Sequence, residues 1–290
     1  MTEVVQNPAP KLGIIAGGGV VPRYLFEACQ KIGRDFFVFC LEGQADKGLA
    51  EDLPHVWLPL GAGARLKAIA AEQQIGEIVM IGRVRRPSLL EIKPDWLAFK
   101  VLTKIGMNML GDDALLRSIG KAIEEEAGLR VIGAQEVFAD LLMPIGQLGK
   151  VAADDQAQRD ISRGLDVALG LGRLDIGQSV IVQQGIVLGV EAIEGTDQLI
   201  VRCGTLQREG VGGVLVKVAK PQQDNRFDLP TVGPDTIRAL LKAGFRGVVL
   251  EAGRSLLVER EQTIALADQG GLFILGHDLR APPLGDTGHG

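Results

Sequence analysis

Short apolar runs alternate with longer amphipathic segments along the first half of the chain. The apolar runs, often closed by glycine, predict buried strands. Segments in which apolar residues recur every three or four positions predict helices. The expected strands are 11–19, 35–43, 56–61, 77–84 and 129–135, and the expected helices are 20–33, 64–76, 94–107 and 113–127. This alternation predicts a parallel sheet covered by helices, in a Rossmann-like α/β domain.

The second half of the chain has a different pattern. Residues 141–155 contain proline and glycine without a clear period, which indicates a linker between two domains. Two β-branched runs divided by Gln-Gly predict a hairpin over 178–192. Further strands are expected at 211–220, 246–253 and 270–276, with helices at 154–172, 233–243 and 260–269. We therefore expect a Rossmann-like N-terminal domain over 11–140, a linker over 141–155 and a distinct, mixed α/β catalytic domain over 156–277.

Composition narrows the functional classes. The formal net charge of −5 and an aromatic content of 4% argue against nucleic-acid binding, which needs a basic face and rings for base stacking. Glycine is abundant, with 39 residues in 290, and many glycines end apolar runs, where a tight turn or a ligand can require them. The three cysteines show no CxxC spacing and are expected to be reduced core thiols. The chain begins without a secretory signal pattern and has no long apolar span, so a cytoplasmic location is expected.

The first strand ends in a glycine turn, "AGGGVVP", in which Gly17, Gly18 and Gly19 precede a helix. A strand, a glycine turn and a helix N-terminus can bind a phosphate, but the third glycine of GxGxxG is replaced by Pro22. A ligand-free turn, a phosphate contact and a dinucleotide site all remain open. Arg83, in "GRVRRP" after the fourth strand, is either a phosphate clamp or part of a solvated basic turn.

Acidic residues cluster where elements begin and end. Asp112 and Asp113 open a helix, where they either cap it or contact a sugar or a metal. Glu191 and Asp197 lie at strand boundaries, and Glu251 ends a strongly apolar strand. The three histidines form no HxH or HExxH pattern, so a zinc hydrolase is disfavoured. A hard cation such as Mg²⁺, held by carboxylates and substrate phosphate, fits this set of side chains better.

One polar stretch, "KPQQDNRFDLPTVG" (220–233), stands out from the apolar segments around it. By composition alone it is equally well a solvated loop or a catalytic one. It resembles, together with other blocks in the same order, the LpxI family of UDP-2,3-diacylglucosamine pyrophosphatases of lipid A biosynthesis. The other blocks are "LGIIAGGGVVP", "GDDALLRSIG", "GAQEV", "LGKV", "GRLDIGQSVIV", "VEAIEGTD" and "EAGRSLLV".

The resemblance implies a cytoplasmic, Mg²⁺-dependent hydrolase that releases UMP and 2,3-diacylglucosamine 1-phosphate (lipid X), with water attacking the phosphorus on the sugar side. It implies binding of UDP-2,3-diacylglucosamine and lipid X between two domains, peripheral contact with the inner-membrane surface and a homodimer. The catalytic residues that it implies are Asp228, Asp224, Lys220 and Arg226. The substrate-binding residues are Gly17, Gly18, Gly19, Arg83, Asp112, Asp113, Gln178, Thr196 and Asp197, and the metal ligands are Asp228, Glu191 and Glu251.

Two alternatives from other classes stay open. An NAD(P)-dependent oxidoreductase would use the glycine turn, with Glu42 near the expected position of a ribose-binding acid. A non-catalytic nucleotide-sugar or lipid-binding protein would bind the same ligands without turnover.

Overall fold

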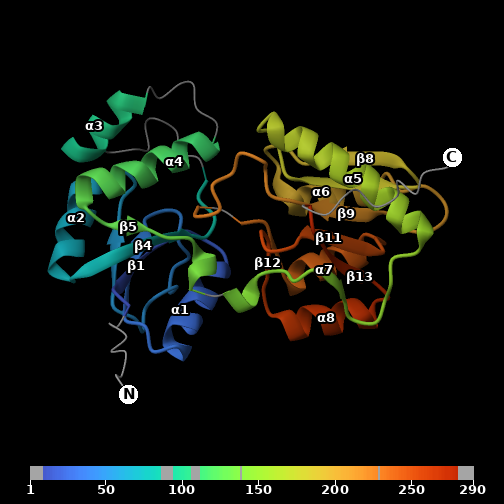
Figure 1. Cartoon of the computed structure of the whole chain (residues 1–290), viewed down its shortest axis with the longest axis horizontal. Helices are drawn as coiled ribbons and strands as arrows, with labels where there is room; N and C mark the ends of the chain where they lie inside the picture. Colours follow the sequence, from blue (N-terminus) through green and yellow to red (C-terminus); the bar gives the residue numbers. More distant parts are fainter. Residues whose placement is uncertain (1–8, 86–93, 106–111, 138, 228, 280–290) are drawn as a thin grey trace, which may run out of the picture. The chain divides into compact units, whose positions relative to one another are not determined.

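The computed structural model describes residues 9–85, 94–105, 112–137, 139–227 and 229–279. The chain forms two compact units (Figure 1). The N-terminal unit consists of residues 1–139 together with 224–228, and the C-terminal unit consists of 140–223 together with 229–290. A short segment from late in the sequence therefore belongs to the first unit.

The N-terminal unit contains a five-stranded parallel sheet in the order β3-β2-β1-β4-β5. This is the order of the first five strands of a doubly wound Rossmann sheet. The strands are β1 (Lys11–Ala16), β2 (Phe36–Leu41), β3 (His55–Leu58), β4 (Ile75–Ile81) and β5 (Arg130–Val131). The helices are α1 (Val21–Lys31), α2 (Gly63–Glu72), α3 (Trp96–Ile105) and α4 (Asp112–Ala122), the last continued by a π-helical turn, η1 (Ile123–Ala127).

The C-terminal unit contains a six-stranded mixed sheet in the order β6-β13-β11-β9-β7-β8. Its strands are β6 (Gly146–Leu148), β7 (Ser179–Gln183), β8 (Ile186–Val190), β9 (Val214–Lys217), β11 (Gly247–Glu251) and β13 (Phe273–His277). The central strands β9, β11 and β13 are parallel, whereas β6 and β7 run antiparallel to their neighbours. The mixed α/β fold class predicted from the sequence is confirmed.

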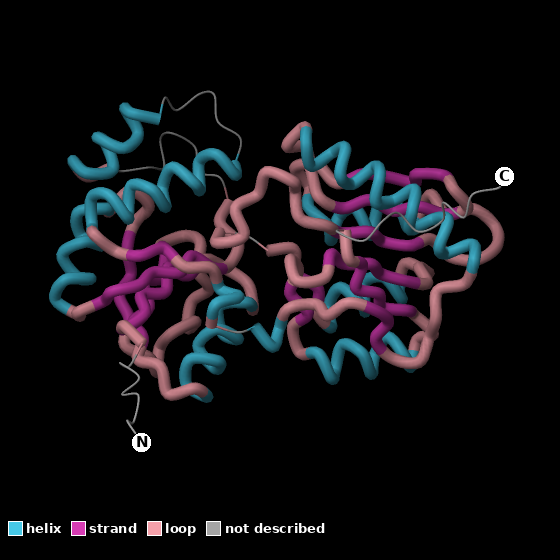
Figure 2. Tube along the Cα trace, in the orientation of Figure 1, coloured by secondary structure: helices cyan, strands magenta, loops and turns pink. Residues whose placement is uncertain are grey.

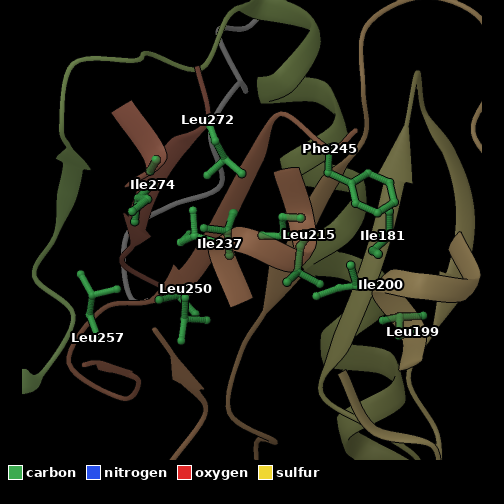
Figure 3. Close-up of a cluster of buried hydrophobic side chains, with 14 of the residues drawn as sticks. Ile181, Leu199, Ile200, Leu215, Ile237, Phe245, Leu250, Leu257, Leu272 and Ile274 are labelled. Carbon is green, nitrogen blue, oxygen red and sulfur yellow. The ribbon is translucent and has the colours of Figure 1, made fainter. Parts of the chain in front are cut away.

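Helices cover both faces of this second sheet. Helix α5 (Asp155–Arg173) packs Ala157, Ile161 and Leu165 against the valines of one face. Helices α6 (Gly195–Gly204), α7 (Pro234–Lys242) and α8 (Arg260–Gln269) bury the other face. Figure 3 shows the side chains of that second core, including Leu215 and Leu250 from the central strands and Ile200 from α6.

The expected hairpin is present as β7 and β8, which turn at Gln184 and Gly185 with φ of 53° and 78°. Gln-Gly suits this turn because glycine tolerates positive φ without steric cost. Helix α6 was not expected, because its apolar run is short and resembles the end of a strand. It is stabilised instead by packing of Leu199, Ile200 and Cys203 into the core.

The segment 141–155, expected to be a linker, contributes structure to the C-terminal unit (Figure 2). Its strand β6 pairs antiparallel with β13, and Met143 is buried in the core. The Asp154 carboxylate accepts a hydrogen bond of 2.7 Å from the Ala157 amide and thereby caps α5. Proline and glycine mark an irregular path here, but backbone pairing with a distant strand makes the path part of the sheet.

The three cysteines are all free and buried. Burial raises the pKa of the Cys29 thiol to about 11, so this side chain stays protonated at neutral pH. Within the described ranges, no helix has the length and apolarity needed to cross a membrane.

Candidate active site

One edge of the C-terminal sheet collects buried polar side chains. The parallel strands β9 and β11 end there at Lys217 and Glu251, and the antiparallel β7 begins there with Ser179. In the backbone register of the sheet, Ser179 lies opposite Lys217, and Glu251 lies opposite His277. Ligands of open α/β sheets bind outside the carboxyl ends of parallel strands, so this edge is the natural place for a site. We call it the carboxyl edge.

At one end of the carboxyl edge, Glu191 organises a hydrogen-bonded network. Its side chain accepts from the Thr196 hydroxyl at 2.9 Å and from the Gln178 amide at 3.3 Å. The Thr196 and Ser179 hydroxyls lie 3.2 Å apart, and the Glu191 amide donates to the Ser179 carbonyl. Glu191 is only 7% exposed. The structure thus brings together Gln178, Glu191 and Thr196, all predicted site residues, with Asp197 next in the first turn of α6.

Glu251 occupies the next part of the edge and is 4% exposed. It accepts hydrogen bonds from the Ala219 amide at 3.0 Å and from the Arg254 guanidinium at 3.1 Å. Beside it, burial lowers the pKa of His277, although the Asp278 carboxylate opposes this shift, so the imidazole is neutral at pH 7. Glu251 thus ends β11 with a carboxylate that is both hydrogen-bonded and ion-paired within the unit.

Lys217 is a buried residue of this edge that the sequence analysis did not single out. It is 9% exposed, and its Nζ donates to the Thr231 carbonyl at 3.4 Å. A signal was available: a lysine interrupts the apolar run of "VLVKVA" at a position whose neighbours are all core residues.

The first part of the predicted catalytic loop, residues 220–223, is anchored within the C-terminal unit. The Lys220 ammonium lies 2.6 Å from the Asp175 carboxylate, and Gln222 donates to the Gly172 carbonyl at 2.6 Å. Gln223 is buried, and its side-chain oxygen accepts from the Lys220 amide at 3.0 Å. These bonds attach the loop to the C-terminal end of α5, so Lys220 already has a carboxylate partner.

The second part of the loop belongs to the N-terminal unit. The Arg226 guanidinium pairs with Asp224 at 2.8 Å and with Glu124 of η1 at 3.0 Å. Hydrogen bonds from Arg226 hold the pKa of Asp224 below its usual value. Phe227 is buried in the core of this unit, against Gly120. Asp228, the residue with the central predicted role, lies outside the described residues.

The glycine turn of the N-terminal unit is closed by its own backbone and by one acid. Gly17 donates to the Ile81 carbonyl, and Gly18 exchanges two hydrogen bonds of 2.8 Å with Arg83. The Gly19 amide, with φ of 86°, donates to the Asp46 carboxylate at 2.9 Å. A Cβ on Gly17 would overlap the Arg83 carbonyl, which explains that glycine by packing alone. Asp112 and Asp113 begin α4 in the same unit.

The structure describes two of the three predicted metal ligands, Glu191 and Glu251. Glu191 directly follows β8 and Glu251 ends β11, and β7 and β9 lie between these two strands in the sheet. No group of three His, Cys, Asp or Glu side chains among the described residues is placed to hold a metal. Mg²⁺ often needs only one or two carboxylates besides substrate phosphate, so either glutamate fits a partial set that substrate completes.

Comparison with known proteins covers nearly the whole chain. The family model of the LpxI N-terminal domain matches residues 11–141, and that of the LpxI C-terminal domain matches residues 144–275. A curated protein of Caulobacter vibrioides, "UDP-2,3-diacylglucosamine pyrophosphatase LpxI", is 43% identical over 281 residues. That alignment includes 94% of this chain and 99% of the relative.

Proposed function

The chain belongs to the LpxI family, and we propose that it is a UDP-2,3-diacylglucosamine pyrophosphatase that acts in lipid A biosynthesis. The observation that carries this proposal is the network at the carboxyl edge. Gln178, Glu191 and Thr196 come from separate sequence blocks that resemble the family, and they meet in one hydrogen-bonded group. Incubation of the purified protein with UDP-2,3-diacylglucosamine and Mg²⁺ tests it, and failure to form UMP would refute it.

The proposed reaction is hydrolysis of the pyrophosphate bond. Water attacks the phosphorus on the sugar side, and the bond from that phosphorus to the bridging oxygen breaks. UMP leaves with the bridging oxygen, and lipid X retains the attacking oxygen. Hydrolysis in ¹⁸O-labelled water should therefore place the label in the phosphate of lipid X. Label in UMP would instead assign attack to the other phosphorus.

We assign the positioning of the attacking water to Asp228. Leu229 precedes Pro230, which favours an extended backbone at this point and gives the loop a defined direction. Two segments that precede it, Lys220–Gln223 and Arg226, are each anchored within their own unit. Because Arg226 and Lys220 already pair with carboxylates, we expect them to contribute chiefly by fixing this loop.

The proposed cofactor is Mg²⁺, with Asp228 and either Glu191 or Glu251 as the protein ligands. When bound, Mg²⁺ would neutralise negative charge on the pyrophosphate oxygens. Glu191 and Glu251 are 7% and 4% exposed, so both carboxylates are largely shielded from bulk water. EDTA should abolish UMP formation, and added Mg²⁺ should restore it. Full activity with excess chelator would exclude this assignment.

Because the proposed substrate carries two acyl chains, we also propose contact with the inner-membrane surface through α3. Trp96 and Phe99, one helical turn apart, are 67% and 61% exposed, although the chain contains few aromatic residues. Replacing both with serine should reduce sedimentation with anionic vesicles. Leu174→Ser, which changes an exposed leucine of the C-terminal unit, is the control.

The homodimer stays a prediction, and sedimentation velocity of the purified protein tests it.

A further inference from the structure

Lys217 is a buried cation that forms no ion pair with any carboxylate in the described part of the chain. Its hydrogen bond to the Thr231 carbonyl is long, at 3.4 Å. Lysine is almost never buried unless it is paired, because removing an ammonium from water is costly. The partly buried arginines Arg254 and Arg246 of this unit, by contrast, pair with Glu251 and Asp154.

The position of Lys217 in the sheet explains why its own unit leaves it unpaired. Lys217 is the last residue of β9, and its backbone neighbours on the adjacent strands are Ser179 and Leu250. Its side chain projects from the same face of β9 as that of Leu215, two residues earlier, which lies in the core shown in Figure 3. The Glu191 carboxylate accepts from the Thr196 hydroxyl and the Gln178 backbone amide, and it forms no ion pair with Lys217.

The surroundings of Lys217 also contain unused hydrogen-bonding capacity. An ammonium has three donors, of which the Thr231 carbonyl takes one. Ser255 is fully buried, and its hydroxyl has no hydrogen-bond partner among the described residues. Ser255 immediately precedes β12 (Leu256–Leu257), which pairs with β10 (Thr231–Val232), the strand that accepts from Lys217. Two buried donor groups therefore border one strand pair, and donors without acceptors fit an anionic oxygen.

We propose that Lys217 contacts the substrate and binds an anionic phosphoryl oxygen with its ammonium group. This proposal rests on the proposed function, since a pyrophosphate supplies the missing negative charge. Lysine binds phosphate as a compact point charge, so a single ammonium at the edge is sufficient. The contact with Thr231, three residues after Asp228, places the bound oxygen beside the end of the proposed catalytic loop.

A purely structural role is the alternative, in which Lys217 only tethers β10. The two roles predict opposite stability effects for Lys217→Met, a side chain of similar length without charge. A phosphate-binding lysine costs stability in the free protein, so the melting temperature of the variant should be unchanged or higher. A structural tether would make the variant melt at a lower temperature.

The experiment measures three quantities for the wild type, Lys217→Met, Lys217→Arg and Lys242→Met. They are the melting temperature, kcat/KM for UDP-2,3-diacylglucosamine, and the affinity for inorganic pyrophosphate by calorimetry. Lys242→Met is the matched control, because Lys242 is an exposed lysine at the end of α7 in the same unit. We expect Lys217→Met to lower kcat/KM by roughly 100-fold or more and pyrophosphate affinity by about 10-fold. Lys217→Arg, which keeps the charge, should recover part of both.

Several outcomes would overturn the proposal. They are pyrophosphate affinity in Lys217→Met equal to that of the wild type, no measurable pyrophosphate binding by the wild type, and a lower melting temperature with normal kcat/KM. If Lys217→Met does not fold, a folded Lys217→Arg with less affinity than Lys242→Met supports the proposal, and equal affinity refutes it. If the wild type binds pyrophosphate through Lys217 but does not hydrolyse the UDP-lipid, the proposed function fails while the anion contact stands.

Discussion

The two sheets of this protein use the carboxyl ends of their strands differently. In the N-terminal unit, the amides of Gly17, Gly18 and Gly19 already donate to Ile81, Arg83 and Asp46. At the carboxyl edge of the C-terminal unit, Lys217 lacks a counter-charge, and the Gln178 side-chain oxygen is buried without a partner among the described residues. In the first region the backbone donors already have partners within the protein, whereas in the second some buried polar groups have none among the described residues.

This difference shows why a glycine-rich turn is weak support for a binding site. The turn resembles a phosphate-binding motif in sequence, yet close backbone packing accounts for Gly17 and an acid already accepts from Gly19. Buried polar groups normally find partners within the protein. Where they do not, as at Lys217, a ligand is the simplest source of the missing partner. Buried polar groups without a protein partner therefore distinguish the two regions better than the glycine-turn motif does.

The largest effect is expected from Asp228→Ala. If this carboxylate positions the attacking water or holds Mg²⁺, its contribution is made in the transition state, so kcat should fall by about 1,000-fold or more with an intact fold. Turnover and the melting temperature are to be measured together. If Asp228 only caps the turn before Pro230, the variant should instead lose about 1 kcal/mol of stability and keep near-normal turnover.

A smaller effect is expected from Glu191→Gln at the carboxyl edge. The amide keeps the size of the side chain but removes the charge that orients Thr196 and Gln178. We expect kcat/KM to fall roughly 10- to 100-fold if Glu191 orients these groups while Glu251 binds Mg²⁺, and by more if Glu191 is itself the Mg²⁺ ligand. Glu194→Gln is the matched control, because Glu194 is more exposed and pairs with Arg202. If Glu191→Gln and Glu194→Gln lost the same factor in kcat/KM, the buried network around Glu191 would have no special role.

Gly17→Ala should affect stability and leave turnover per folded molecule unchanged. The added Cβ overlaps the Arg83 carbonyl, and forced overpacking of this kind costs about 1–3 kcal/mol. Denaturant unfolding and kcat measure the two effects separately. Gly170→Ala is the control, because no atom lies within 4 Å of the added carbon in α5. Its stability should be unchanged or higher, since alanine is favoured over glycine inside a helix. A large loss of kcat in folded, stable Gly17→Ala protein would instead indicate that the glycine turn binds substrate.

The smallest effect is expected from Asp224→Asn, through its dependence on pH. Arg226 lowers the pKa of Asp224 in the folded state, so this carboxylate stabilises the protein above its unfolded pKa of about 3.9. That stability is lost as the pH falls through the folded pKa. The wild type should therefore be more stable than Asp224→Asn at pH 7, and the difference should shrink toward pH 3. A difference independent of pH would assign the effect to lost hydrogen bonds alone.

Much of the fold could be predicted from local pattern. Apolar runs closed by glycine identified the parallel strands of the first sheet, and Gln-Gly identified the β7–β8 turn. The strand-end residues Gln178, Glu191 and Glu251 were also candidates from sequence, and the structure places all three at the carboxyl edge. These features depend on side-chain periodicity and turn chemistry, which act over a few neighbouring residues.

Tertiary structure decided what depends on distant partners. Strand β6 forms because β13 offers it an edge, and Phe227 lies in the N-terminal core although it is far away in sequence. The pairing of Arg226 with Glu124, and the lack of a carboxylate partner for Lys217 among the described residues, are likewise long-range outcomes. Local pattern determines which side chains can be buried and charged. Only the folded chain determines which of those charges are satisfied, because the partner comes from elsewhere in the sequence.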